Sequence, residues 1–265
     1  MTTWDWIERF LQLYWPQFLK GAGWTLLLAI IGTVGGFVIG LLIGVVRTTP
    51  LYSGGQKRRS LRSVLLKIVN AILAVYIEVL RGTPMMVQAV LVFYGLMEFA
   101  GIDITSSAAG MLVITLNTGA YMAEIVRGGI QSVDPGQTEA SKAIGMTHWQ
   151  TMLNVVLPQT IRNILPATGN EFIVNLKDSS VLSVIMVSEL FYSTQVIKSI
   201  YYRTYEPFLI AATIYLFFTF TSSRLLRLLE KRMDGPSNYT LISSATTPEL
   251  LKQNRRYQAG ATRRR

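Results

Sequence analysis

The sequence of 265 residues contains no cysteine and a single histidine, His148. Disulfides and cysteine metal sites are therefore excluded, and a histidine-rich metal site is excluded as well. HExxH and GxSxG sequences are also missing, and one histidine leaves no credible catalytic triad. The sequence thus gives no support to a hydrolytic enzyme, and no metal or other cofactor of its own is expected.

Charge is scarce and unevenly distributed, with only 15% charged residues in the whole chain. No charged residue occurs between Gly21 and Val46, and about 20 apolar residues are enough to cross a bilayer. This run is too long for a signal peptide and follows a charged, tryptophan-rich stretch, so we interpret it as a membrane span. Further apolar regions predict an all-α, polytopic membrane protein with about five crossings, the others lying at about 68–99, 106–127, 163–193 and 207–228.

Two of these regions are irregular. The second is interrupted by "EVLRGTPMM", where Pro84 removes a backbone donor and Gly82 loosens the helix. We interpret it as one interrupted crossing, with two separate short helices as the alternative. The fourth region would be roughly 45 Å long as a helix, which exceeds the hydrocarbon core, so it must tilt, kink or protrude.

The first apolar run contains glycine at every fourth position: Gly32, Gly36, Gly40 and Gly44. Because residues four apart lie on one face of a helix, these glycines form a flat strip on which another helix can approach closely. The strip therefore predicts helix packing and says nothing about chemistry.

Basic residues cluster at the ends of the apolar runs, which accounts for the net charge of +10 without a nucleic-acid partner. The loop 47–67 is basic and lacks acidic residues, and the fifth region also ends in a basic cluster. The positive-inside rule makes both cytoplasmic, so the N-terminus is predicted outside and the C-terminus inside. Residues 1–20 predict an amphipathic helix at the lipid interface, and 233–265 a basic, disordered cytoplasmic tail.

A polar segment, 134–158, follows the third region on the predicted cytoplasmic side. Asp134 is a good N-cap, Pro135 suits the first helical position, and Gln137 completes a capping-box pattern. Gly145 is the type of residue that ends helices in the left-handed conformation. The pattern predicts a short helix between Asp134 and Gly145.

Thr147 and Gln150 repeat the capping-box spacing and begin a second short helix, which Pro158 is expected to interrupt. Pro166 is expected to mark the entry to the fourth region. Such short helices need packing to be stable. From the residues alone, the pair either docks into another protein or packs only on its own membrane domain.

The same segment resembles the EAA signature of ABC importer permeases, EAA-x3-G followed about a dozen residues later by LP. The residues that match are Glu139, Ala140, Gly145, Leu157 and Pro158, while Ser141 stands in place of the second alanine. The stretches 78–88, 120–140 and 165–183 are similar to the polar-amino-acid branch of this family, of the histidine, glutamine and arginine type.

The resemblance covers about 21–232 and implies an ABC type-1 transmembrane domain in a bacterial cytoplasmic membrane. In that family the EAA loop couples the permease to cytoplasmic ATPase subunits, with a second permease copy or paralogue and an outside solute-binding protein as further partners. No G-x4-G-K-[ST] stretch occurs here, so ATP would bind to a partner chain. The alternative, a stand-alone secondary transporter or channel subunit, leaves the two capped helices unexplained.

Ionisable residues inside a span are costly and are therefore candidates for function. For the substrate pathway the candidates are Asp178, Glu78, Asn175, Ser179 and Arg81. Asp178 would accept a hydrogen bond from the ammonium group of an amino-acid substrate. Hydroxyls or backbone N–H groups near the RGTP break would donate to the carboxylate of the substrate. The competing interpretation is a set of structural ion pairs, which we favour for Glu124 and Arg127.

Overall fold

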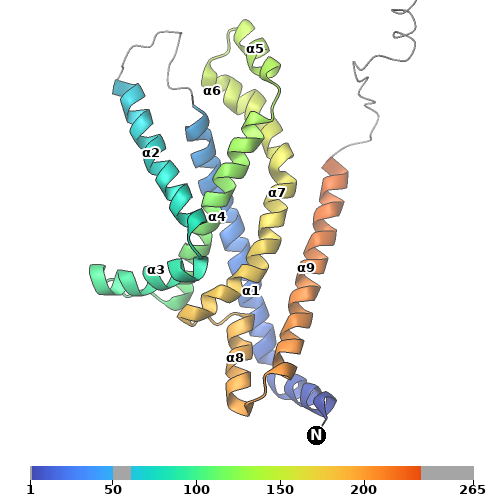
Figure 1. Cartoon of the computed structure of the whole chain (residues 1–265). Helices are drawn as coiled ribbons and strands as arrows, with labels where there is room; N and C mark the ends of the chain where they lie inside the picture. Colours follow the sequence, from blue (N-terminus) through green and yellow to red (C-terminus); the bar gives the residue numbers. More distant parts are fainter. Residues whose placement is uncertain (1, 50–60, 234–265) are drawn as a thin grey trace, which may run out of the picture. The chain divides into compact units, whose positions relative to one another are not determined.

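The computed structural model describes residues 2–49 and 61–233, and every regular element within them is helical. In chain order (Figure 1) these are α1 (Thr3–Thr48), α2 (Leu61–Gly82), α3 (Met85–Ala100), α4 (Ser106–Gln131), α5 (Pro135–Ala143), α6 (His148–Thr151), a π turn (Met152–Val156), α7 (Leu157–Asp178), a 3-10 turn (Ser179–Ile185), α8 (Leu190–Tyr201) and α9 (Tyr205–Met233). The predicted all-α architecture is confirmed. Residues up to Arg227 form one compact unit and those from Leu228 a second, and the predicted tail lies outside the described residues from 234 onward.

Helices α1, α2, α4 and α9 are each long and apolar enough to cross a membrane. The segments His148–Ile185 and Leu190–Tyr201 are bent by 51° relative to each other, and counted together as one span they give a fifth candidate crossing. Of the three expected outcomes, a tilt, a kink or a protrusion, the structure shows a bend in the fourth region. The predicted end of the fourth region at about residue 193 was wrong. Helix α8 continues through Lys198 to Tyr201 and leaves only 202–204 as the connection to α9.

The N-terminal residues continue into the first crossing without a break, although Pro16 lies within the helix and the first turns bend away from the rest (Figure 1). Phe10 and Phe18 are fully buried and pack in one cluster with Leu190 and Ile197 of α8. Aromatic residues at helical spacing here bury one face against protein. Residues 3–20 are therefore part of the folded unit, and their placement at a lipid interface stays a prediction.

The glycine strip of α1 is confirmed as a helix-packing surface, and its partner is α4. A Cβ atom on Gly40 would lie 2.3 Å from the Cβ of Met122 and 2.7 Å from its carbonyl carbon. Gly36 and Gly44 meet Thr118 and Val126 at comparably short distances. The backbones of α1 and α4 can approach this closely only because the strip has no side chains.

The break in the second region occurs at the predicted place, but the single interrupted crossing was wrong. Helix α2 alone is long enough to span, and α3 is a separate, shorter apolar helix that runs across the direction of α2 (Figure 1). Pro84 has no N–H and disfavours helical geometry at Thr83, so the chain leaves α2 there and starts a new helix. The structure therefore shows two separate helices, as in the alternative, but only α3 is short.

Candidate functional site

The first helix of the polar segment ends where the sequence predicts. Gly145 has a φ of 82°, in the left-handed region that only glycine adopts readily. The predicted capping box between Asp134 and Gln137 is absent. The carboxylate of Asp134 instead accepts from the backbone N–H of Gly136 at 2.8 Å, one residue earlier than a capping box requires.

The second capping box is confirmed, with bonds of 2.8 and 3.3 Å between Thr147 and Gln150. The expected interruption at Pro158 was wrong, because α7 begins at Leu157 and continues through both Pro158 and Pro166. Pro158 lies in the first turn of α7, where a helix needs no N–H donor, and the π turn before it adjusts the backbone. The helix that starts in the polar segment therefore leads directly into the fourth crossing.

The EAA-like residues divide between a packed face and an exposed face. Ser141 is buried and its hydroxyl donates to the carbonyl of Gln137 at 2.7 Å, whereas Glu139 and Ala140 are exposed. Leu157 is half-buried and packs with Val133, Met152 and Val156. The segment is thus anchored on its own membrane domain by one face.

The segment also carries apolar side chains that the described residues leave largely exposed. Ile144 is 79% exposed, Leu153 60% and Trp149 48%. These three residues surround the Gly145 turn and the start of the π turn. Large apolar side chains exposed this close together in the sequence are consistent with a contact surface for another protein.

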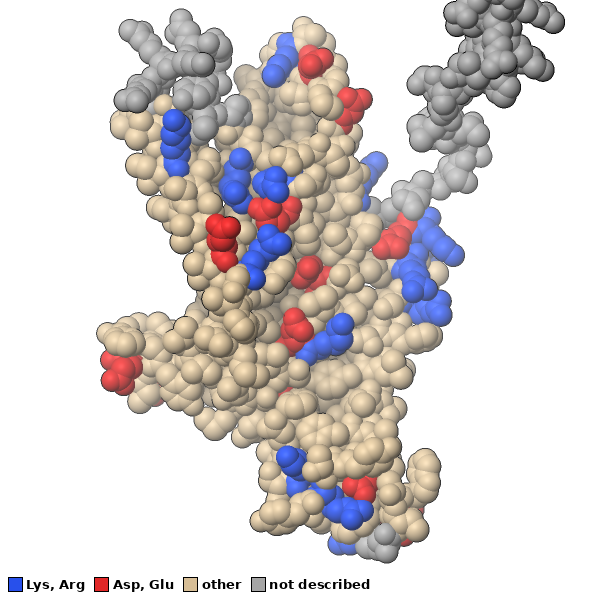
Figure 2. Space-filling view, viewed as in Figure 1, with Lys and Arg blue, Asp and Glu red and all other residues tan. Residues whose placement is uncertain are grey.

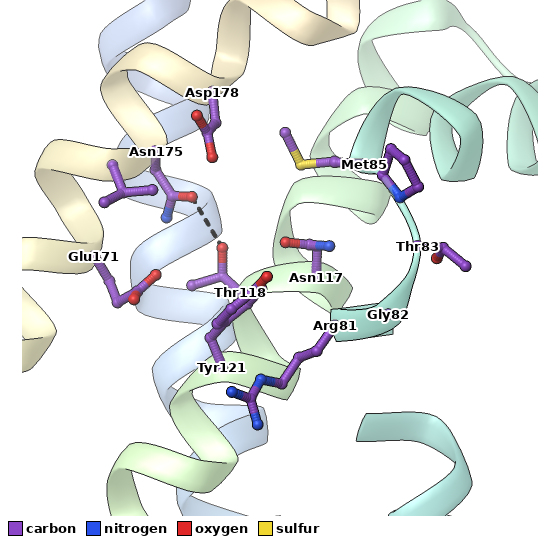
Figure 3. Close-up of a pocket in the computed structure, with 12 residues that line it drawn as sticks. Arg81, Gly82, Thr83, Met85, Asn117, Thr118, Tyr121, Glu171, Asn175 and Asp178 are labelled. Atoms are coloured by element: carbon purple, nitrogen blue, oxygen red, sulfur yellow. Dashed lines mark hydrogen bonds between the residues drawn. The ribbon is translucent and has the colours of Figure 1, made fainter. Parts of the chain in front are cut away.

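A cavity of about 550 Å³ lies between α7, α4 and the α2–α3 break (Figure 3). We call it the substrate cavity because predicted pathway residues line it, and its role stays a prediction. Three of the predicted pathway residues line it: Arg81, Asn175 and Asp178. Ser179 does not, because it is buried and its hydroxyl donates to the carbonyl of Leu176. Glu78 lines a neighbouring cavity instead.

Acidic and basic groups enter the substrate cavity from different helices. Glu171 and Asp178 project from α7, one on each side of Asn175, and Arg81 projects from the end of α2 beside Tyr121 (Figure 3). The Arg81 guanidinium carbon lies 5.3 Å from the centre of the Tyr121 ring, within cation–π range. The cavity therefore presents both signs of charge.

One wall of the cavity is held by a buried polar chain. The amide of Asn175 donates to the hydroxyl of Thr33 and accepts from the hydroxyl of Thr118, each at 3.0 Å. These residues come from α7, α1 and α4, and all three are buried. Because both ends of the amide are engaged, the orientation of Asn175 is set by protein rather than by ligand.

The opposite wall is the α2–α3 break, whose carbonyls are satisfied by two side chains that sequence reasoning missed. Gln88 donates to the carbonyls of Leu80 and Thr83 at 2.8 and 2.9 Å, and Asn117 donates to Leu80 at 3.2 Å. The signal that could have identified them is an amide residue in an otherwise apolar helix. The start of α3 has no side-chain cap and contributes Met85 to the wall, and the donation of its backbone N–H groups to a substrate stays a prediction.

Glu124 and Arg127 form the structural ion pair that we favoured, and Arg47 is a third member. One carboxylate oxygen of Glu124 lies 2.6 Å from Arg47 and the other 2.6 Å from Arg127. All three side chains are partly covered, so water screens the attraction less than at an open surface. The group ties the end of α1 to α4.

The family described as "binding-protein-dependent transport system inner membrane component" matches residues 63–235. The chain belongs to this permease family. The permease is 39% identical over 219 residues to the glutamine transport system permease protein GlnP of Escherichia coli strain K12, covering 82% of this chain and 93% of that one. It is 37% identical over 227 residues to the nopaline transport system permease protein NocM of Agrobacterium fabrum, covering 81% and 87%.

A solved structure described as an amino acid ABC transporter with histidines is 43% identical to the permease. Its TM-score is 0.72, and the match covers 83% of this chain and 95% of that chain. The resemblance to ABC importer permeases of the polar-amino-acid branch is confirmed, as is the type-1 fold. Together with the apolar helices, these relatives make the permease a multi-pass inner-membrane protein.

Proposed function

We propose that this permease moves polar amino acids into the cell by alternating access, as the transmembrane subunit of an ATP-driven importer. The observation that carries the proposal is the substrate cavity, which places Arg81, Glu171 and Asp178 together inside the membrane domain. Ionisable groups in such a position mark substrate pathways. The relatives named for glutamine and nopaline transport support the same substrate class.

The charges of the cavity complement an amino acid. A zwitterion needs cationic donors for its carboxylate, and Arg81 with the uncapped start of α3 supplies them. Asp178 accepts the ammonium group. Glu171 then remains for the substrate side chain, which favours a side chain that carries hydrogen-bond donors, such as an amide or a guanidinium.

ATP would bind to separate cytoplasmic subunits, and the segment 134–158 would transmit their movement. The exposed Ile144 and Trp149 are suited to a cleft in the ATPase, since buried aromatic and aliphatic anchors dominate such contacts. The capped helices and the Gly145 turn make the segment stiff, and α7 joins it directly to Glu171 and Asp178. The assembly includes a second permease copy or paralogue and an outside solute-binding protein, with the N-terminus outside and the C-terminus cytoplasmic.

Reconstitution tests this assignment. In liposomes, the permease together with its ATPase subunits and solute-binding protein is expected to accumulate radiolabelled glutamine or arginine only when ATP is present. The permease without ATPase subunits is expected to accumulate neither. Accumulation by the permease alone would instead establish the secondary-transporter alternative.

Replacing Gly145 by Val tests the coupling segment. A β-branched residue at a φ of 82° costs about 1–2 kcal/mol, so the turn between the two helices should shift and substrate-stimulated ATP hydrolysis should fall about 10-fold. Binding of substrate to the purified complex should persist. The measurement is ATP hydrolysis with and without substrate.

Gly128→Val is the matched control for Gly145→Val, because Gly128 lies within α4 and a Cβ atom added there would meet no other part of the protein within 4 Å. It is expected to retain coupled hydrolysis. Unchanged hydrolysis and uptake in Gly145→Val would count against a coupling role for this segment.

A further inference from the structure

A second cavity, of about 370 Å³, lies next to the substrate cavity, and we call it the inner cavity. It is lined by α1, α2 and α4, through Arg47, Ala74, Glu78, Arg81 and Glu124 among others. Arg81 and Gly82 line both cavities. The inner cavity is displaced towards the end of α1 and the Glu124–Arg127 pair, which is the end predicted to face the cytoplasm. On the face of the protein drawn in Figure 2, acidic and basic side chains run down the middle.

The charged groups of the inner cavity are not all neutralised by one another. Glu124 is occupied by Arg47 and Arg127. Across the described residues, however, the carboxylate of Glu78 has neither a hydrogen-bond partner nor an ion-pair partner. Arg47 donates one of its five N–H groups to Glu124. The cavity thus retains one open acceptor and several open cationic donors.

No contact among the described residues accounts for the carboxylate of Glu78. It lies within α2, a helix that is long and apolar enough to span, and its side chain is exposed. A carboxylate in such a helix costs several kcal/mol unless it faces water or a partner. Arg81 follows three residues later, so both side chains lie on one face of α2. Cavities of about 300 Å³ and more are large enough for small ligands.

We propose that the inner cavity is a second binding station for the transported amino acid, on its way from the substrate cavity to the cytoplasm. The proposal rests on the transport function proposed above. Glu78 accepts the ammonium of the substrate, and Arg47 and Arg81 donate to its carboxylate. Arg81 has a long side chain and borders both cavities, so it can hold the carboxylate while the substrate moves from one station to the other.

Thiol labelling tests the station, because the native sequence has no cysteine and a single introduced cysteine is the only target in the permease chain. Ala74→Cys reports the inner cavity and Val174→Cys reports the substrate cavity. Each variant is labelled in the complete complex with a cationic methanethiosulfonate, with and without glutamine, and the labelled permease is quantified by mass. Where glutamine occupies a station, labelling slows about 10-fold at a concentration roughly 10 times the Kd.

Both cysteines are expected to be protected by glutamine. Adding Glu78→Gln to Ala74→Cys should remove its protection, whereas adding Glu78→Gln to Val174→Cys should leave protection intact. The control substitution Glu98→Gln removes an exposed carboxylate of α3 outside both charged cavities and should change neither. In the cysteine-free protein, Glu78→Gln should lower turnover while substrate affinity is kept.

Three results would overturn the station. One is protection at Val174→Cys without protection at Ala74→Cys. Another is protection at Ala74→Cys that survives Glu78→Gln, since the substrate would then not be held by Glu78. The third is wild-type turnover in Glu78→Gln. Absence of protection at both cysteines together with absence of uptake would instead contradict the proposed function itself.

Discussion

Asp178→Asn is expected to lower the rate of amino-acid uptake at sub-saturating substrate by about 10- to 100-fold. A hydrogen bond to a charged group contributes about 1.5–3 kcal/mol, and the neutral amide loses this attraction for the substrate ammonium. Asn keeps the size of the side chain, so the wall of the cavity should persist. Uptake of radiolabelled glutamine by the reconstituted complex measures the effect.

Two variants separate the charge of Asp178 from its packing. Asp178→Glu keeps the carboxylate and should restore part of the uptake. Lys177→Gln changes the neighbouring exposed residue, which does not line the substrate cavity, and should transport normally. Wild-type uptake by Asp178→Asn would remove this residue from the substrate site.

Gly40→Leu is expected to prevent correct packing of the membrane domain. Even a Cβ at this position would lie 2.3 Å from Met122, with the backbone of α4 directly behind it. Helices α1 and α4 would have to separate, at a cost of about 3 kcal/mol or more. The yield of folded protein and its thermal unfolding in detergent should both fall.

Gly23→Leu is the matched control for Gly40→Leu, because it places the same side chain on the same helix. No atom lies within 4 Å of the Cβ position of Gly23, so nothing has to move. Leucine also has a higher helix propensity than glycine. Its Tm should therefore equal or exceed that of the wild type, and an equal loss in both variants would contradict the packing argument.

Most features that depend on residues close together in the chain were predictable from the sequence, although the expected capping box of Asp134 and Gln137 is absent. Long apolar runs predicted four to five candidate crossings, although not the separation of the second run into α2 and α3, and glycine at every fourth position predicted the contact surface of α1. The left-handed turn at Gly145 and the capping box of Thr147 and Gln150 were likewise predicted. Each of these follows from hydropathy or backbone conformation over a few residues.

The prolines show where such reasoning stops. Pro84 does separate two helices, whereas Pro158 and Pro166 are accommodated within α7. A proline ends a helix only when neither a first-turn position nor an adjusted backbone accommodates the missing N–H, and the identity of the residue does not reveal this. The direction of α3 after the break depended in the same way on the surrounding helices.

Hydropathy and capping determined from the sequence an all-helical membrane protein with a polar helical segment after its third apolar region, because both are local properties, and the EAA-like motif added the resemblance to permeases. Only the tertiary structure decided which charged residues meet. Arg81 reaches Tyr121 and the cavity of Asp178, Glu78 falls in a separate cavity, and Ser179 turns back to its own helix. Those outcomes depend on the rotation and close approach of helices far apart in the chain, which the glycine strip makes possible but does not specify.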